Sequence, residues 1–268
     1  MSYLYKILDL MQIYDVSDKK QRIGRDFDGG YVVLDNLSKA TEVVYSFGVG
    51  DDVSFDSHFS IKYNVPVKMY DHTDEVNISY SGDKGLAEGA NCEFYKIGIS
   101  PIDSVQTKTL KTLLDKKDIS KRKLLKLDVE GAEWESLASI DSDTLKLFDQ
   151  IIIEFHELHR LAPNSYLANA LKVDYPYTPD YSQMCYEGLK KLTDDFYIFH
   201  AHVNNAKALH LFESYKIPPF LEVSLVRKDL VTASLTQQIF PTDIDMRNHE
   251  HLDEIQLNFW PFMRENYA

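Results

Sequence analysis

Residues 123–133 read KLLKLDVEGAE, an apolar run that ends abruptly in the acids Asp128, Glu130 and Glu133. Such a run is typical of a strand buried on both faces, and the carboxyl ends of parallel strands are where an α/β sheet forms its ligand crevice. We therefore expect chemistry just past Leu127. For Glu133 we favour a plainer role at a solvated helix start, where an acid interacts with the helix dipole, whereas Asp128 still lies within the strand pattern.

Two later apolar runs end in the same way, QIIIEFHELHR at 150–160 and DFYIFHAHVNN at 195–205. Side chains alternate across a strand, so polar residues two apart point the same way. A single buried His is as often a core residue as a ligand, but three polar strand ends in one domain favour a site. The polar residues at these two ends are Glu154, His156, His200, His202, Asn204 and Asn205.

Apolar or β-branched runs recur along the whole chain. Polar or helical-looking stretches separate most of them, with lengths that suit right-handed crossovers. This alternation predicts a doubly wound α/β fold, with a mainly parallel sheet and helices on both faces. The runs lie near residues 43–47, 66–70, 93–99, 123–128, 149–155, 195–201 and 220–227.

The chain has 268 residues and a hydrophobic content of 44%, enough for one large core. No internal repeat, low-complexity tract or Gly/Ser linker marks a boundary. We predict a single domain over residues 1–268, with a helical and looped preface at about 1–40 and a C-terminal arm at about 232–268.

The formal charge of -13, from 29 basic and 42 acidic residues, argues against a nucleic-acid partner, because neutralising phosphates requires basic surface. Residues 1–16, MSYLYKILDLMQIYDV, predict an amphipathic helix and not a secretory signal, and no run approaches the roughly twenty apolar residues of a membrane span. Cys92 and Cys185 lack a metal-type spacing and fit buried thiols of a reducing compartment. We expect a cytoplasmic protein.

A possible cofactor loop follows the first strand, in VVYSFGVGDDVSFD at 43–56. Gly48 and Gly50 allow a tight turn and a close approach of the backbone to a ligand. Val53 stands where the dinucleotide fingerprint has its third glycine, and no GxxxxGK phosphate loop occurs, so NAD and ATP are both disfavoured. Asp71 ends the second strand, where a carboxylate can accept both hydroxyls of a ribose. The combination suits S-adenosylmethionine better than a dinucleotide.

These residues resemble the FkbM-type S-adenosylmethionine-dependent methyltransferases, and LDVEGAE is the most specific part of the resemblance, which spans about residues 22–228. The resemblance implies a class I methyltransferase sandwich, with a seven-stranded sheet whose last strand is antiparallel. The segments that carry it are RDFDGGYVV at 25–33, SFGVGDDVSFD at 46–56, LLKLDVEGAEWE at 124–135, IIIEFHEL at 151–158, HVNN at 202–205 and LEVSLVRK at 221–228.

The resemblance also implies roles for single residues. Gly48, Gly50 and Asp51 match the cofactor loop, Asp71 the ribose-binding acid, and Asp128 the acid near the transferred methyl. This chain departs from many class I enzymes at Ser46, where they carry an acid, so Asp51 or the DGGY segment at 28–31 would replace that contact. Acceptors in the family range from macrolide hydroxyls to sugars, so the resemblance leaves the acceptor open.

Methyl transfer to a sugar hydroxyl needs help in removing the hydroxyl proton, from either a base or a metal. His156 is our candidate base, in a role it can exchange with His202. Asp128, Glu154 and His202 are the candidate ligands of Mg or Mn, since carboxylates suit hard cations and a His can complete the set. Asp128 and Glu154 are thus candidates for both catalysis and metal binding.

The predicted function is a methyltransferase acting on a hydroxyl of a sugar, in particular a nucleotide-activated sugar used in polysaccharide biosynthesis. Its diphosphate would need local positive charge, from Arg22, Arg25, Arg160 or Lys207. The Tyr- and Pro-containing segment 160–187 is a candidate acceptor lid. Two alternatives stay open, an NAD(P)-dependent sugar oxidoreductase and a catalytically silent binding domain, and a homo-oligomer is compatible with either.

Overall fold

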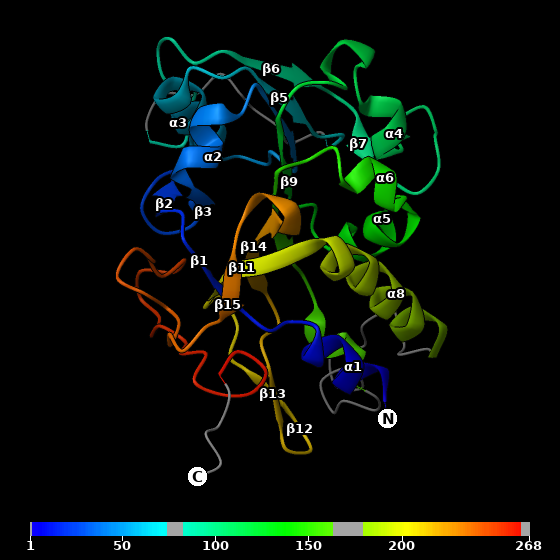
Figure 1. Cartoon of the computed structure of the whole chain (residues 1–268), viewed down its shortest axis with the longest axis vertical. Helices are drawn as coiled ribbons and strands as arrows, with labels where there is room; N and C mark the ends of the chain where they lie inside the picture. The colour runs from blue at the N-terminus through cyan, green and yellow to red at the C-terminus, as the bar shows by residue number, and fades with distance from the viewer. Residues whose placement is uncertain (1, 74–82, 163–178, 264–268) are drawn as a thin grey trace.

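A seven-stranded sheet runs through the centre of the molecule (Figure 1). The computed structural model describes residues 2–73, 83–162 and 179–263. Only β14 runs antiparallel to its neighbours, which confirms the class I methyltransferase fold with one antiparallel strand. In spatial order the strands are β11 (Phe196–Val203), β14 (Leu221–Arg227), β10 (Gln150–Phe155), β9 (Lys123–Leu127), β4 (Val43–Phe47), β5 (Val67–Tyr70) and β6 (Cys92–Tyr95).

The apolar runs of the sequence are the strands of this sheet. Strands β4, β9 and β10 are buried along their whole length, because both faces of the sheet are covered. The expected run at 93–99 divides into β6 and the short β7 (Gly98–Ile99), which pairs with β8 (Thr107–Lys108).

Helices cover one face of the sheet, on the right of Figure 1. In α8, Cys185, Leu189 and Leu192 are fully buried, at the spacing of one helical stripe. The helix packs against α5, α1 and β11, and Trp134 of α5 stacks on Phe155 of β10 with 4.4 Å between ring centroids. The helices of this side are α1 (Tyr3–Asp9), α4 (Leu110–Leu113), α5 (Glu133–Ser139), α6 (Ser142–Leu145) and α8 (Pro179–Asp195).

The opposite face is only partly helical. Helix α3 (Ser54–Tyr63) packs on β5 and β6, but an antiparallel hairpin of β2 (Lys20–Ile23) and β3 (Tyr31–Leu34), followed by α2 (Asp35–Ala40), covers β10 and β14. The backbone NH of Leu34 donates to Gln150 Oε1 at 2.7 Å, and this bond holds the hairpin to the sheet. The expected preface of helix and loop is therefore partly a β-hairpin that closes the core.

An N-terminal and a C-terminal strand pair with each other. The helix expected over residues 1–16 ends at Asp9, and β1 (Tyr14–Val16) pairs antiparallel with β15 (Ala233–Leu235). Beyond β15 the arm contributes Phe240, Leu257 and Phe262 to the core. The C-terminal arm is therefore attached to the sheet by side-chain packing and side-chain hydrogen bonds more than by regular secondary structure.

The remaining elements are short. They are the hairpin of β12 (His210–Phe212) and β13 (Tyr215–Ile217), and the 3₁₀ turns η1 (Lys116–Asp118), η2 (Leu158–Leu161) and η3 (Lys228–Leu230). Cys92 and Cys185 are free thiols, and burial raises the pKa of both to about 12. Within the described ranges no helix is both long and apolar enough to cross a membrane.

Candidate active site

A pocket of about 530 Å³ opens at the carboxyl ends of the central strands. The lining has two halves, one on the β4 side of β9 and one on the β10 side. They meet at Lys126, which lies in β9, and at Asp128, which directly follows it. The β4 half is lined by Gly48–Asp52, Asp71–Thr73, Gly98 and Ile99, and the β10 half by Asp28, Glu154, His156, Asn204 and Phe220. The pocket thus joins the predicted cofactor loop to residues from all three predicted polar strand ends, although His200 and His202 do not line it.

The glycine loop forms the floor of the β4 half. Gly48 and Gly50 have φ angles of 85° and 54°, a left-handed conformation that side chains rarely adopt. A Cβ atom on Gly48 would lie 1.4 Å from the backbone oxygen of Asp128, so only glycine lets the loop pass the end of β9. Ser46, by contrast, is buried and does not line the pocket, whereas Tyr31 of the DGGY segment does.

Asp71 braces the glycine loop. Its Oδ2 accepts hydrogen bonds from the backbone NH groups of Val49 at 3.0 Å and Gly50 at 3.1 Å, and its Oδ1 accepts from Thr73. Burial opposes ionisation, but these bonds outweigh it and lower the pKa of Asp71. Asp51 lies at the rim, with a side chain 76% exposed and an ion pair of 2.9 Å to Lys84.

Asp128 occupies the junction of the two halves. Tyr31 donates its phenol proton to Asp128 Oδ2 at 2.5 Å, and burial beside this carboxylate raises the pKa of Tyr31 well above its usual range. Lys126 Nζ lies 3.3 Å from the same oxygen and donates to the Gly48 carbonyl at 2.9 Å. Burial opposes the charge of Lys126, but Asp128 outweighs it and raises the pKa. Asp128 Oδ1 is left facing the β10 half.

His156 and Glu133 form a buried pair beside Asp128. Glu133, fully buried, lies 3.0 Å from His156 Nδ1 through its Oε1 and accepts from the backbone NH groups of Val129 and Gly131. Glu133 therefore does not lie at a solvated helix start, as we expected, but supports His156. On the other side of the ring, His156 Nε2 is 3.9 Å from Asp128 Oδ1. Burial opposes the imidazolium, but Glu133 and Asp128 outweigh it and raise the pKa of His156 to about 10.

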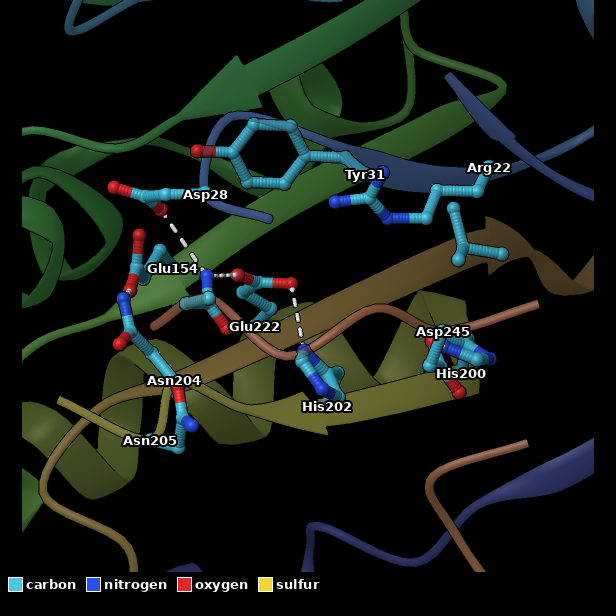
Figure 2. A network of polar contacts seen from close by, with 12 residues as sticks. Arg22, Asp28, Tyr31, Glu154, His200, His202, Asn204, Asn205, Glu222 and Asp245 are labelled. Atoms are coloured by element: carbon cyan, nitrogen blue, oxygen red, sulfur yellow. Dashed lines mark hydrogen bonds and ion pairs between the residues drawn. The ribbon is translucent and has the colours of Figure 1, made fainter. Parts of the chain in front are cut away.

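The predicted metal ligands are not brought together. Glu154 accepts a hydrogen bond from Asn204 at 3.0 Å, while His202 lies between Glu222 at 3.4 Å and Glu254 at 3.3 Å (Figure 2). Strand β14 separates them, since Glu222 pairs in register with both Glu154 and His202. His202 is therefore two strand spacings, about 10 Å, from Glu154.

A different set converges among the described residues. Asp128, Glu133 and His156 each offer a ligand atom within 4.8 Å of the others. These atoms already have partners: both oxygens of Glu133 accept backbone NH groups, and the ammonium of Lys126 lies beside Asp128. Such a set fits a hydrogen-bonded His–Glu pair better than the open oxygen shell that Mg or Mn prefers.

None of the four predicted phosphate-binding cations lines the pocket. Arg22 donates to backbone carbonyls, Arg25 pairs with two aspartates, and Arg160 contacts Glu157. Lys207 is exposed, and its Nζ lies 4.8 Å from the ring centroid of Phe220 in the pocket wall. Of the proposed lid, residues 163–178 lie outside the described residues.

Sequence reasoning gave no role to Tyr31, Lys126 or Phe220. A lysine inside an apolar strand run is itself a signal, because a buried ammonium needs a partner. Tyr31 and Phe220 carry no such signal, since aromatic residues beside strands are ordinary core residues.

The arrangement matches a known family. Residues 22–175 match the family model described as "Methyltransferase FkbM domain". None of the curated proteins matches the sequence significantly. This match favours a methyltransferase over the NAD(P)-dependent oxidoreductase and over a silent binding domain.

Two solved structures are similar at low levels. The plantazolicin methyltransferase BpumL in complex with SAH shares 10% identity over 69% of this chain and 76% of its own, with a TM-score of 0.30. The methyltransferase CalO6 shares 9% identity over 69% of this chain and 57% of its own, with a TM-score of 0.32. Because the family model covers more than half of its length, the chain belongs to the FkbM methyltransferase family and is an S-adenosylmethionine-dependent methyltransferase.

Proposed function

We propose that this protein methylates a hydroxyl group of a sugar, and that the sugar is nucleotide-activated and used in polysaccharide biosynthesis. The observation that carries the reaction type is the His156–Glu133 pair, whose second ring nitrogen lies at the junction of the two pocket halves, 3.6 Å from Glu130 Oε2 and 3.9 Å from Asp128 Oδ1. A hydroxyl is a poor nucleophile at neutral pH, so a base at this point addresses the main chemical difficulty.

The β4 half is our proposed cofactor site. S-adenosylmethionine supplies an electrophilic methyl group on its sulfonium when bound. Gly48 and Gly50 let the loop backbone approach a ligand closely, and Asp71, at the end of β5, lies where the ribose hydroxyls of such a cofactor are expected. Asp51 at the rim and Asp128 at the junction complete the set. The negative charge of Asp128 would attract the sulfonium.

His156 is our proposed general base. Because Glu133 accepts the Nδ1 proton, deprotonation of His156 would remove the proton of Nε2 and leave the lone pair there. Nε2 then accepts the proton of the acceptor hydroxyl as the oxygen attacks the methyl group. Because the nearby carboxylates favour the imidazolium, the bound sulfonium should help to discharge His156 by opposing its positive charge.

We expect turnover to survive chelation. The converging carboxylates have protein partners, and the transfer step needs only a base, so excess EDTA should leave kcat within about twofold and added Mg or Mn should not raise it. Dialysed enzyme assayed with and without chelator gives the measurement. Loss of activity in EDTA that Mg or Mn restores would instead return catalysis to the metal hypothesis.

The proposed acceptor is supported by the distribution of charge. Lys207 beside Phe220 offers an exposed cation at the rim of the β10 half, where a diphosphate can reach it. The deeper wall is acidic, so the uncharged sugar would point inward. A small soluble acceptor of this kind fits an enclosed pocket better than a polymer does.

A panel of nucleotide-sugars incubated with radiolabelled S-adenosylmethionine is the direct test. We expect methyl transfer to at least one member, at an oxygen identified by mass spectrometry and NMR. Macrolides, amines and carboxylates serve as comparison acceptors. Transfer to those compounds alone would refute the sugar assignment while leaving the methyltransferase assignment intact.

A further inference from the structure

Four side chains of the β10 half have no part in the transfer step described above. They are Asp28, Glu154, Asn204 and Phe220, and they come from four separate segments of the chain. Figure 2 shows Asp28, Glu154 and Asn204 clustered together, apart from His200 and Asp245. Polar side chains gathered on one wall of a pocket are the usual means by which a ligand is oriented.

Glu154 and Asn204 form a fixed hydrogen-bonding unit. Asn204 Nδ2 donates to Glu154 Oε1 at 3.0 Å, and Asn204 Oδ1 accepts the backbone NH of Ala206 at 3.0 Å. The orientation of the amide is therefore set, and its donor group faces Glu154. With Oε1 occupied as an acceptor, the other oxygen of Glu154 is available to a ligand.

Glu154 lies among other acids. It is only 4% exposed, it pairs across the sheet with Glu222, and Asp128 and Asp28 share its pocket. Burial, together with the charges of Asp128 and Glu222, raises the pKa of Glu154 well above its usual range. The second oxygen of Glu154 therefore lies in the pocket as a buried polar group beside other acids, where a ligand hydroxyl would give it a hydrogen-bond partner.

The C-terminal arm holds Asp28 at the mouth of the pocket. Asn248, which is buried, donates to Asp28 Oδ1 at 3.1 Å and to Glu222 Oε1 at 2.7 Å. Asn205 fastens the same part of the arm, because its amide donates to the carbonyls of His249, Leu252 and Asp253. Asn248 is thus a positioning residue for Asp28, which retains free lone pairs for a ligand.

A sugar ring matches this wall. Hydroxyl groups both donate and accept, so they can pair with the side-chain oxygens of Glu154 and Asp28. A phosphate in the same place would face Asp28 and Asp128. Phe220, whose ring centroid is 5.2 Å from that of His156, adds an apolar surface against which the CH groups of a sugar can pack.

We propose that Asp28, Glu154, Asn204 and Phe220 form the subsite for the sugar ring of the acceptor, in which Glu154 hydrogen-bonds a ring hydroxyl through its second oxygen and the diphosphate lies outward at Lys207. This inference rests on the proposed function and deepens it. It sets the ring deep in the β10 half, with one hydroxyl at His156 and others at Glu154 and Asp28.

Two substitutions of Glu154 test its hydrogen-bonding role. Glu154→Gln keeps a hydrogen-bonding group of the same shape, whereas Glu154→Leu removes it. With the best nucleotide-sugar of the panel, Glu154→Leu should raise the acceptor KM by roughly 10- to 100-fold, the scale for leaving a buried partner unpaired, and Glu154→Gln by much less, about threefold. The affinity for S-adenosylhomocysteine, measured by calorimetry, should stay unchanged in both.

Glu250→Gln is the matched control, because it makes the same chemical change on an exposed residue of the arm. If Glu154→Gln impairs acceptor binding as much as Glu154→Leu, a hydrogen-bonding group at this position is not sufficient for acceptor binding and the inference is overturned. An unchanged acceptor KM in Glu154→Leu would overturn it as well. Failure of the wild-type enzyme on every nucleotide-sugar would defeat the proposed function instead, so the two failures are distinguishable.

Discussion

Replacing His156 by Gln or Ala should lower kcat by roughly two to four orders of magnitude, the usual contribution of a general base. In neutral His156 the lone pair of Nε2 faces the junction of the pocket, and the other described imidazole of the lining, His72, lies in the β4 half, away from the proposed acceptor. Cofactor affinity should change little, since His156 lies in the β10 half. Single-turnover rates with saturating acceptor, together with calorimetry of S-adenosylhomocysteine, separate the two effects.

The pH profile gives a second measure of the same residue. The pKa of His156 is raised to about 10, so the neutral base becomes more abundant as pH rises and log kcat/KM of the wild-type enzyme should climb with pH below that value. Glu133→Gln removes the charge that favours the imidazolium. This substitution should move the rising part of the pH profile to lower pH and reduce kcat/KM on the plateau at higher pH. A purely structural role of Glu133 would not shift the profile.

His58→Gln controls for the substitution itself, because His58 is exposed and does not line the pocket. Melting temperatures show whether each variant is folded. A His156→Gln enzyme that turns over at the wild-type rate, or that keeps the wild-type pH limb, would exclude His156 as the base.

Gly48→Ala should reduce S-adenosylhomocysteine affinity by about 100-fold or more, a loss of about 3 kcal/mol that matches severe overpacking. The new Cβ would lie 1.4 Å from the Asp128 backbone oxygen, so the loop and the end of β9 cannot keep their positions. Both move away from the point where the two pocket halves meet. Calorimetry measures the affinity, and thermal unfolding measures the accompanying loss of stability.

Gly89→Ala is a close control. Gly89 has φ 89°, against 85° for Gly48, but a Cβ there would meet no atom within 4 Å. Both variants share the cost of a left-handed alanine, about 1 to 2 kcal/mol, and only Gly48→Ala adds the clash. Equal affinities in Gly48→Ala and Gly89→Ala would disprove the role of Gly48.

Asp71→Ala should weaken binding of S-adenosylhomocysteine by a smaller amount, about 1 to 3 kcal/mol, because the loop loses its bracing and the ribose loses a partner.

The positions of the strands along the chain can be predicted from local sequence. Each strand is an apolar run of its own, so the expected run at 43–47 is β4 and the run at 123–128 is β9 with Asp128 just beyond its end. The glycine turn likewise needs positive φ angles that Gly48 and Gly50 alone supply locally. An apolar run and a glycine turn are each encoded by a few consecutive residues. The local sequence is therefore sufficient to predict them.

Lateral neighbours were decided only by the tertiary structure. The sequence predicted that Glu154 and His202 lie at similar heights at the ends of their strands. In the structure β14, which comes late in the sequence, lies between β10 and β11, so Glu222 is the neighbour of both residues. Glu133 has the local pattern of a helix start, yet the packing of α5 under β10 brings it to His156. The sequence by itself therefore determined the strands, the glycine turn after β4 and the family. Tertiary structure decided which polar residues share a site, because side-chain periodicity specifies height and face within one strand and carries no information about which strand lies beside it.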